Sequence, residues 1–231
     1  MLTHEICLDN EKFKRKPVNR KIGEISLRIT QNKAEIGIQD LASQLVQPNG
    51  KSWIPARFEG ERKNENWHSQ SLFALDFDNG ITFEEVMQRL TEYGLSCTFA
   101  YTTFSNSPSL SKFRVVFQIQ EAIVEPSFRD EIQFGLMALF PEVDKSCKDR
   151  ARLFFGGQEL IHEDYEYCLD IERLIQAVDF HSIKDSNRSN MARDLRRRKE
   201  RLTSNENGSK NHSLYSKYIG DGGNASNTAE L

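Results

Sequence analysis

An apolar strand pattern that ends in two carboxylates constrains this chain more than any other feature of its sequence. Residues 71–80 read Ser-Leu-Phe-Ala-Leu-Asp-Phe-Asp-Asn-Gly. Because successive side chains on a strand point to opposite faces, Asp76 and Asp78 are predicted to share one face, with Phe77 on the other. Carboxylates at a strand end are ligands that Mg²⁺ or Mn²⁺ uses together with substrate phosphates. The run therefore predicts a divalent-metal site for phosphoryl or nucleotidyl transfer.

The segments around this strand predict an α+β fold. Strands are expected over residues 72–77, 97–103, 113–119 and 152–155, and helices over 82–93 and 126–140. The order is βαββαβ, the RRM-like or ferredoxin-like unit, over about residues 71–157. With crossovers of the usual hand, the first two strands are parallel and the last two run opposite to them. We therefore expect Asp76 and Asp78, the turn 105–112 and the segment 144–152 to meet at one rim.

The rest of the 231 residues divides by composition. Residues 1–20 are polar and basic and are interpreted as a loose N-terminal leader. Residues 21–180 are expected to form the main domain, in which N-terminal αβ elements precede the RRM-like unit: a helix over 40–46 and an edge strand over 52–58. Beyond the unit, Leu160-Ile161 suggests a fifth strand and residues 171–178 a helix. Residues 181–231 are interpreted as a basic helix followed by a disordered polar tail.

Charge is distributed unevenly along the chain. The net charge is -3, but residues 184–201 carry +5, which leaves -8 elsewhere. A basic helix of this kind can neutralise nucleic-acid phosphates, and a solvated helix without a partner is the alternative. The candidate nucleic-acid-binding residues are Arg193, Arg196, Arg197, Arg198 and Lys199.

Composition excludes several classes of protein. No stretch approaches the roughly 20 apolar residues of a membrane span, and the N-terminus lacks a signal peptide, so a cytoplasmic protein without a membrane partner is expected. The four cysteines are scattered without a C-x-x-C pair, so neither zinc nor an iron-sulfur cluster is predicted. The thiols are expected to be reduced.

Further charged residues are expected at the rim. Asp144 is the first candidate for a third carboxylate, and Asp149 competes with it. Three crowded acids repel one another unless cations neutralise them, which favours one or two bound divalent ions. Lys112, Arg114 and Arg152 are the candidates for binding phosphate.

These residues resemble the archaeo-eukaryotic primase superfamily, in particular the primase-polymerases of plasmids, phages and integrative elements. The resemblance rests on residues 74–80, on 101–107 with 113–117, and on 144–149 with 151–157. It implies that Asp76, Asp78 and Asp144 are the catalytic metal ligands, and that Arg152 supports the nucleotide or these acids. In the second family motif a histidine follows the serine directly or after one residue and contacts the nucleotide phosphates. Here Asn106 follows Ser105, and an amide never carries positive charge.

The resemblance implies a DNA primase or primase-polymerase. Such an enzyme would make primers for a mobile element or plasmid by two-metal nucleotidyl transfer with Mg²⁺ or Mn²⁺. Its partners would be a single-stranded DNA template and nucleoside triphosphates, with a replicative helicase as a further partner. Ser105, Asn106, Lys112, Arg114 and Arg152 would bind the nucleotide.

Two alternatives remain open. The first is a catalytically weakened primase relative that binds nucleic acid without synthesis, as RNA-recognition folds do. Asn106, which replaces the histidine of the family motif, favours this alternative. A haloacid-dehalogenase-like phosphatase also opens with Asp-x-Asp at a strand end. Gly80 stands where the threonine of that motif would be, and no later Asp-Asp pair follows a strand.

Overall fold

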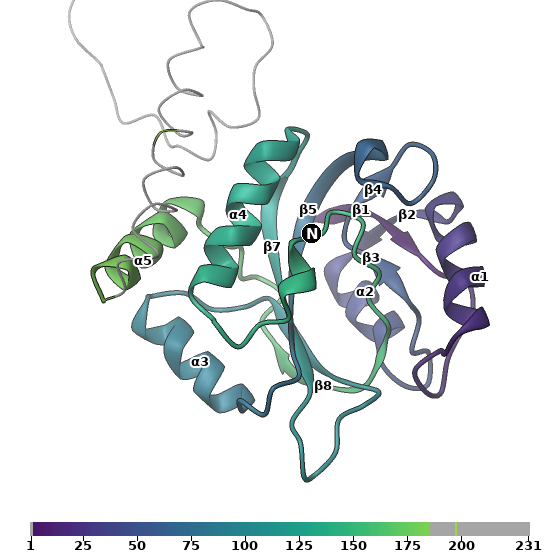
Figure 1. The fold of residues 1–231 in the computed structure, drawn as a ribbon, viewed down its shortest axis with the longest axis horizontal. Coiled ribbons are helices and arrows are strands. Elements are labelled where there is room, and N and C mark those ends of the chain that lie inside the picture. Colours follow the sequence, from purple (N-terminus) through teal and green to yellow (C-terminus); the bar gives the residue numbers. More distant parts are fainter. Residues whose placement is uncertain (1, 185–196, 198–231) are drawn as a thin grey trace, which may run out of the picture.

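The chain forms two sheets of antiparallel strand pairs with helices packed around them, which confirms the α+β class (Figure 1). The structure is a computed structural model that describes residues 2–184 and residue 197. The smaller sheet has the order β2-β1-β3, with β1 (Thr3–Leu8), β2 (Lys33–Gly37) and β3 (Trp53–Ile54). The larger has the order β4-β5-β7-β6-β8, with β4 (Arg57–Phe58), β5 (Trp67–Phe77), β6 (Phe99–Thr103), β7 (Phe113–Ile123) and β8 (Gly157–Glu163). The α-helices are α1 (Arg20–Arg28), α2 (Ile38–Leu45), α3 (Phe83–Glu92), α4 (Pro126–Ala138) and α5 (Ile171–Lys184).

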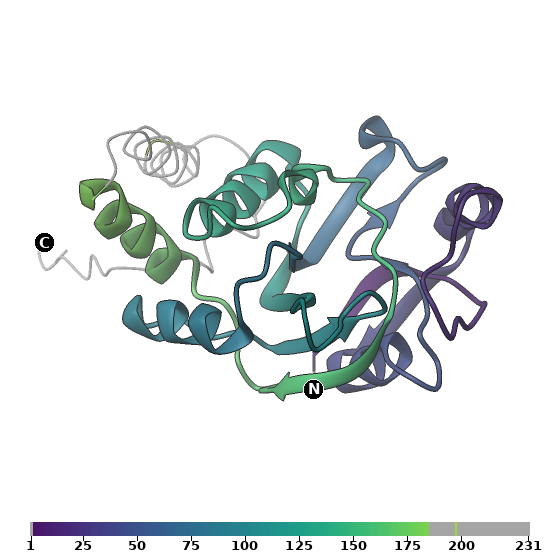
Figure 2. The ribbon, with the colours of Figure 1, turned by 60° about the horizontal axis from the view of Figure 1, so that its bottom comes forward.

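The helices gather in two places, and the larger sheet lies between them. Figures 1 and 2 show α3, α4 and α5 to one side of this sheet, while α1 and α2 lie with the smaller sheet on the other side. Helix α4 packs on β5, on β7 and on α5. The strands β5 and β7 therefore form the centre of the molecule, and their ends are the natural place for a site between the two groups of elements.

The expected chain order βαββαβ is confirmed as β5-α3-β6-β7-α4-β8. Strands β5 and β6 both pair antiparallel with β7, so they run parallel to each other as predicted. The capping box at the start of α3 is present: the Thr82 side chain accepts a hydrogen bond from the backbone of Glu85, and Glu85 accepts one from the backbone of Thr82. Pro126 occupies the first turn of α4, where a missing N–H costs nothing.

The last strand of this unit differs from the prediction in position. Residues 152–155 form only an isolated bridge between Phe154 and Trp53, and the strand begins at Gly157 and pairs with β6. The edge beside β5 is taken by the short β4. Two glycines before and at the start of β8 allow the chain to pass close to other backbone segments. A Cβ on Gly157 would lie 1.9 Å from the Thr102 carbonyl oxygen, and a Cβ on Gly156 would lie 2.4 Å from the backbone of Gly50. A side chain at either position would push the crossing away.

The expectation of a loose leader over residues 1–20 is wrong for its first part. Thr3–Leu8 is the central strand of the smaller sheet, and His4, Ile6 and Cys7 are buried. His4 is accommodated because its ring nitrogens hydrogen-bond Ser71 and Gln118 at 2.8 and 3.0 Å. The polar residues that follow dominated the composition of the segment and hid a six-residue strand. Residues 9–19 form no helix or strand.

The single edge strand expected over 52–58 is divided between the two sheets. Trp53 and Ile54 pair with β1, whereas Arg57 and Phe58 pair with β5, and Pro55 lies between the two pieces. Proline lacks the N–H that an unbroken ladder would need, so the chain changes sheets at this position. The helix expected over 40–46 is present as α2, and that over 171–178 is present as part of α5.

Candidate functional site

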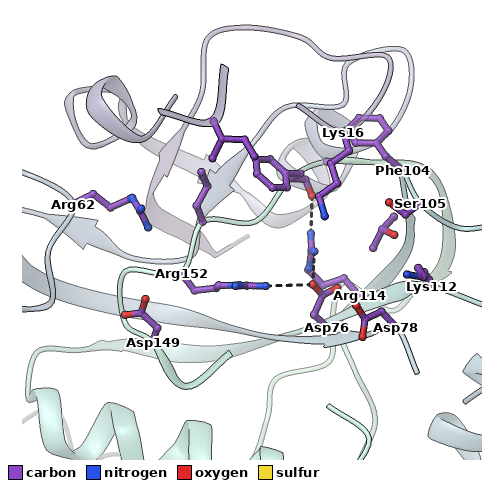
Figure 3. Close-up of a pocket in the computed structure, with 15 residues that line it drawn as sticks. Lys16, Arg62, Asp76, Asp78, Phe104, Ser105, Lys112, Arg114, Asp149 and Arg152 are labelled. Carbon is purple, nitrogen blue, oxygen red and sulfur yellow. Dashed lines mark hydrogen bonds and ion pairs between the residues drawn. The ribbon is translucent and has the colours of Figure 1, made fainter. Parts of the chain in front are cut away.

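A cavity of about 480 Å³ opens where β5, β6 and β7 meet segments that precede β5 and the segment that precedes β8 (Figure 3). Its lining contains five basic side chains and three acidic ones. The charged residues are Lys16, Arg62, Lys112, Arg114, Arg152, Asp76, Asp78 and Asp149. The remaining lining is Ile22, Thr103, Phe104, Ser105, Leu153, Phe155 and Gly156. The expected convergence of the strand end, the β6–β7 turn and the segment before β8 is therefore found.

Strand register places the first acid beside a buried arginine. Asp76 lies opposite Arg114, and Arg114 lies opposite Tyr101, so the three side chains form a row across the sheet. Arg114 Nη2 donates to Asp76 Oδ2 at 3.0 Å, and its Nη1 donates to the Tyr101 hydroxyl and to the Phe155 carbonyl, both at 2.6 Å. The Tyr101 hydroxyl also accepts a hydrogen bond from Trp53 Nε1 at 3.0 Å. This row holds the Asp76 carboxylate in one place at the cavity wall.

The residue between the two aspartates faces the other way, as the alternation predicted. The Phe77 ring stacks on Phe113 with centroids 5.0 Å apart and meets Phe140 edge-on at 5.5 Å. Phe77 is fully buried, whereas Asp78 is exposed at the cavity. One strand end therefore anchors the core with its aromatic side chain and presents two carboxylates to the cavity.

Asp144 is not among the residues that line the cavity, although Arg152 connects it to Asp76. Arg152 reaches both acids: its Nη2 lies 2.8 Å from Asp144 Oδ2 and 3.8 Å from Asp76 Oδ2. The backbone N–H of Asp144 donates to the Asp76 carbonyl, which ties the segment before β8 to the end of β5. Asp144 Oδ1 accepts the backbone N–H of Ser146 and so caps a short 3₁₀ helix. In this structure Asp144 orients Arg152.

The electrostatics of this group follow from burial and pairing. Burial acts to raise the pKa of Asp144, but hydrogen bonds from Ser146 and the positive charge of Arg152 outweigh it, and the pKa is lowered. Burial acts to lower the pKa of Arg114, and the Asp76 carboxylate overcomes it and raises that pKa. Arg114 is thus charged at any physiological pH. Cys147, whose Sγ accepts the Asp76 backbone N–H, has its pKa raised to about 12, chiefly by burial and then by the Asp76 charge.

The acids present at the cavity fit part of a ligand set for a hard cation. Within the described residues, no group of three or more His, Cys, Asp or Glu side chains is arranged to hold a metal ion. Asp76 and Asp78 nevertheless both reach the cavity from the same strand end. Mg²⁺ commonly takes one or two protein carboxylates and completes its shell with water and substrate phosphates. The pair therefore suits an ion that binds together with a phosphate-bearing substrate.

The turn between β6 and β7 brings Ser105 and Lys112 to the cavity but not Asn106. The Asn106 side-chain oxygen accepts the backbone N–H of Lys112 at 2.9 Å and closes the turn. The backbone carbonyl oxygen of Asn106 accepts a hydrogen bond from Gln158 Nε2 at 3.2 Å. Asn106 therefore stabilises the turn that brings Ser105 and Lys112 to the cavity.

Sequence reasoning missed two of the basic residues at the cavity. Lys16 lies on the connection between β1 and α1, and Arg62 lies between β4 and β5. Neither is near a motif, and Lys16 falls in the segment interpreted as a leader. Asp149, the competing third carboxylate, does line the cavity, and Figure 3 shows it beside Arg152 and away from Asp78. No local pattern could have identified Lys16 or Arg62, because only tertiary contacts bring them here.

A second buried arginine supports the segment that carries Arg152. Arg129 on α4 is 2% exposed and donates from Nη1 to the Lys148 carbonyl at 2.9 Å and from Nε to Gln70 at 3.0 Å. Its neighbour Asp130 forms an ion pair with Arg150 at 2.5 Å. Helix α4 thus fixes the path of residues 148–150 just before Arg152.

The predicted nucleic-acid-binding segment lies outside the described residues, apart from Arg197. Nothing in the structure therefore tests Arg193, Arg196, Arg198 or Lys199. Across residues 2–184 and 197, no helix has both the length and the apolar character needed to cross a bilayer.

No protein-family model matches the sequence, and no curated protein matches it. Among solved structures, the chain is similar to the AEP domain of the cyanophage S-2L primase-polymerase, with a TM-score of 0.43 and 13% sequence identity. The match covers 63% of this chain and 78% of that chain. Function is therefore inferred from the residues of the cavity.

Proposed function

We propose that this chain is a metal-dependent nucleotidyltransferase of the primase-polymerase type, which extends or makes primers on a single-stranded DNA template. One observation carries the proposal: a single cavity contains two carboxylates from one strand end and five basic side chains. Carboxylates serve a divalent cation, and an excess of basic side chains serves a polyphosphate. A site for neutral substrates would need neither the paired carboxylates nor the excess of basic side chains.

Each residue has a part in this proposal. Asp76 and Asp78 would hold Mg²⁺ or Mn²⁺, while Lys112 and Arg152 would bind phosphate oxygens. When bound, the ions would favour deprotonation of the attacking 3′-hydroxyl and stabilise the leaving pyrophosphate. Arg114 would keep Asp76 aligned without leaving its own buried position. Asp144 as a direct ligand stays a prediction from the sequence.

The test is a primer-synthesis assay with single-stranded template, nucleoside triphosphates and Mg²⁺ or Mn²⁺. Asp78→Asn is the sharper variant, because Asp78 is exposed whereas Asp76 pairs with a buried arginine. We expect product to fall by at least about 100-fold with the melting temperature unchanged, since metal ligation contributes several kcal/mol to the transition state. Glu84→Gln, on the exposed face of α3, is the matched control. Undiminished metal-dependent synthesis by Asp78→Asn would refute the proposal.

A second candidate function is nucleic-acid binding without synthesis. It is favoured by Asn106, which stands where the related motif has a phosphate-contacting histidine and which faces its own turn. Under this reading the wild-type protein retains single-stranded DNA in a filter-binding assay but yields no product at any Mg²⁺ or Mn²⁺ concentration. In either function the template would run past the cavity, and a mobile replicon with its helicase is the proposed cellular setting.

A further inference from the structure

We propose that Lys16, supplied by the N-terminal elements, binds the terminal phosphate of a nucleoside triphosphate and makes the cavity selective for triphosphates. This inference rests on the proposed function, because it concerns the same cavity. It adds a residue that lies outside the RRM-like unit and outside every motif in the sequence. The β1–α1 connection then becomes part of the nucleotide site.

The connection that carries Lys16 is fastened to the fold. The backbone N–H of Phe13 donates to the Asn49 carbonyl at 3.2 Å, and Gln47 Nε2 donates to the Phe13 carbonyl at 2.8 Å. Pro17, the residue after Lys16, is buried. Lys16 is therefore held above the cavity by contacts on both sides of it.

Among the residues that line the cavity, no ion pair joins the Lys16 ammonium group to an acid (Figure 3). Its Nζ lies over the Phe155 ring, 5.8 Å from the ring centroid. An exposed cation–π contact contributes only about 0.5–1 kcal/mol, so a phosphate oxygen can readily replace it. The ammonium group is thus available to an anionic ligand.

Position within the cavity favours the phosphate end of the ligand. Figure 3 shows Lys16 on the side of the cavity that also holds Ser105, Lys112 and the two aspartates, while Arg62 and Asp149 lie toward the opposite side. A metal at Asp76 and Asp78 would take phosphate oxygens as ligands, so the rest of the phosphate chain must lie nearby. Lys16 and Lys112 then face that chain from two different elements.

A cation that contacts only the outermost phosphate strengthens binding of triphosphates and leaves monophosphates almost unaffected. We expect Lys16→Gln to weaken ATP binding by about tenfold, which corresponds to about 1.4 kcal/mol. AMP binding should change by less than about twofold, because AMP lacks the outer phosphate. Lys16→Arg keeps the positive charge and should retain most of the preference for ATP.

The experiment is a calorimetric titration of the full chain with ATP and with AMP in the presence of Mg²⁺ and without template. Lys14→Gln is the matched control, since Lys14 is an exposed lysine on the same connection and does not line the cavity. Melting curves confirm that each variant is folded. An ATP-to-AMP preference in Lys16→Gln equal to that of the wild type overturns the inference.

Failure of this inference and failure of the proposed function give different results. If wild type makes primers and Lys16→Gln binds ATP as tightly as wild type does, the role of Lys16 falls and the nucleotidyl-transfer proposal stands. If Lys16→Gln loses the ATP preference but wild type makes no product, the role of Lys16 stands and synthesis falls. If wild type binds no ATP, both are overturned.

Discussion

Replacement of Arg114 by methionine should be among the most damaging single substitutions in this chain. The Arg114 guanidinium is buried and forms three hydrogen bonds, to Asp76, Tyr101 and the Phe155 carbonyl. It also lies over the Phe154 ring, 4.5 Å from its centroid. Methionine fills similar space but leaves the Asp76 carboxylate, which is 14% exposed, with only the longer contact of 3.8 Å to Arg152.

The magnitude follows from the cost of breaking a buried ion pair. Removing one partner of such a pair typically costs about 3–5 kcal/mol, because the remaining charge is left desolvated. For a domain of this size each kcal/mol lowers the melting temperature by about 2–4 °C, so a fall of about 6–20 °C is expected. Urea unfolding and thermal melting at neutral pH measure both quantities.

A double-mutant cycle separates the pair from the rest of the contacts. Asp76→Asn removes the charge that loses its closest partner in Arg114→Met. The double variant should therefore be more stable than the sum of the two single losses predicts, by about 1–3 kcal/mol. Arg20→Met is the matched control, because Arg20 pairs with Glu24 while its side chain is 94% exposed, and it should change stability by less than about 0.5 kcal/mol. A loss below about 1 kcal/mol in Arg114→Met would show that this pair does not anchor the site.

Three further predictions concern other parts of the fold. Burial lowers the pKa of His4, so the folded state disfavours protonation of this side chain, and the stability of the protein should decline as pH falls below about 6.5. The urea midpoint should therefore fall between pH 7.5 and pH 5, and it should fall less in His4→Gln than in the wild type. Equal falls in the two proteins would contradict this prediction. Thr82→Ala removes the capping box of α3 and should cost about 0.5–2 kcal/mol in urea unfolding, whereas Thr91→Ala on the same helix should cost clearly less. Asn106→His breaks the bond to the Lys112 backbone, so we expect a lower melting temperature and no gain in ATP affinity by calorimetry; a tenfold gain would place residue 106 at the phosphates.

Local patterns predicted much of the central fold because they depend on neighbouring residues alone. The alternation around Asp76 and Asp78 predicted which side chains share a face, and the capping box that begins at Thr82 predicted the start of α3. The strand order then placed Ser105, Lys112 and Arg152 around one cavity. These features follow from periodicity, capping and crossover handedness, all of which act within short stretches or simple topologies.

Other features could not be predicted because they depend on contacts between distant segments. The strand Thr3–Leu8 is stable only because it pairs with β2 and β3 and because the buried His4 side chain forms a hydrogen bond with Ser71. The last strand lies beside β6 because Gly156 and Gly157 let the chain cross against other backbone. Neither property is visible in the composition of its own segment.

The division is clearest at the cavity itself. By its own alternation the sequence determined that two carboxylates would face one side of a strand end. Only the tertiary structure decided that Arg114 would hold one of them, that Asp144 would orient Arg152, and that Lys16 would reach the cavity from the N-terminal elements. The reason is physical: alternation is a property of one strand, whereas charge pairing depends on side chains that folding brings together from across the chain.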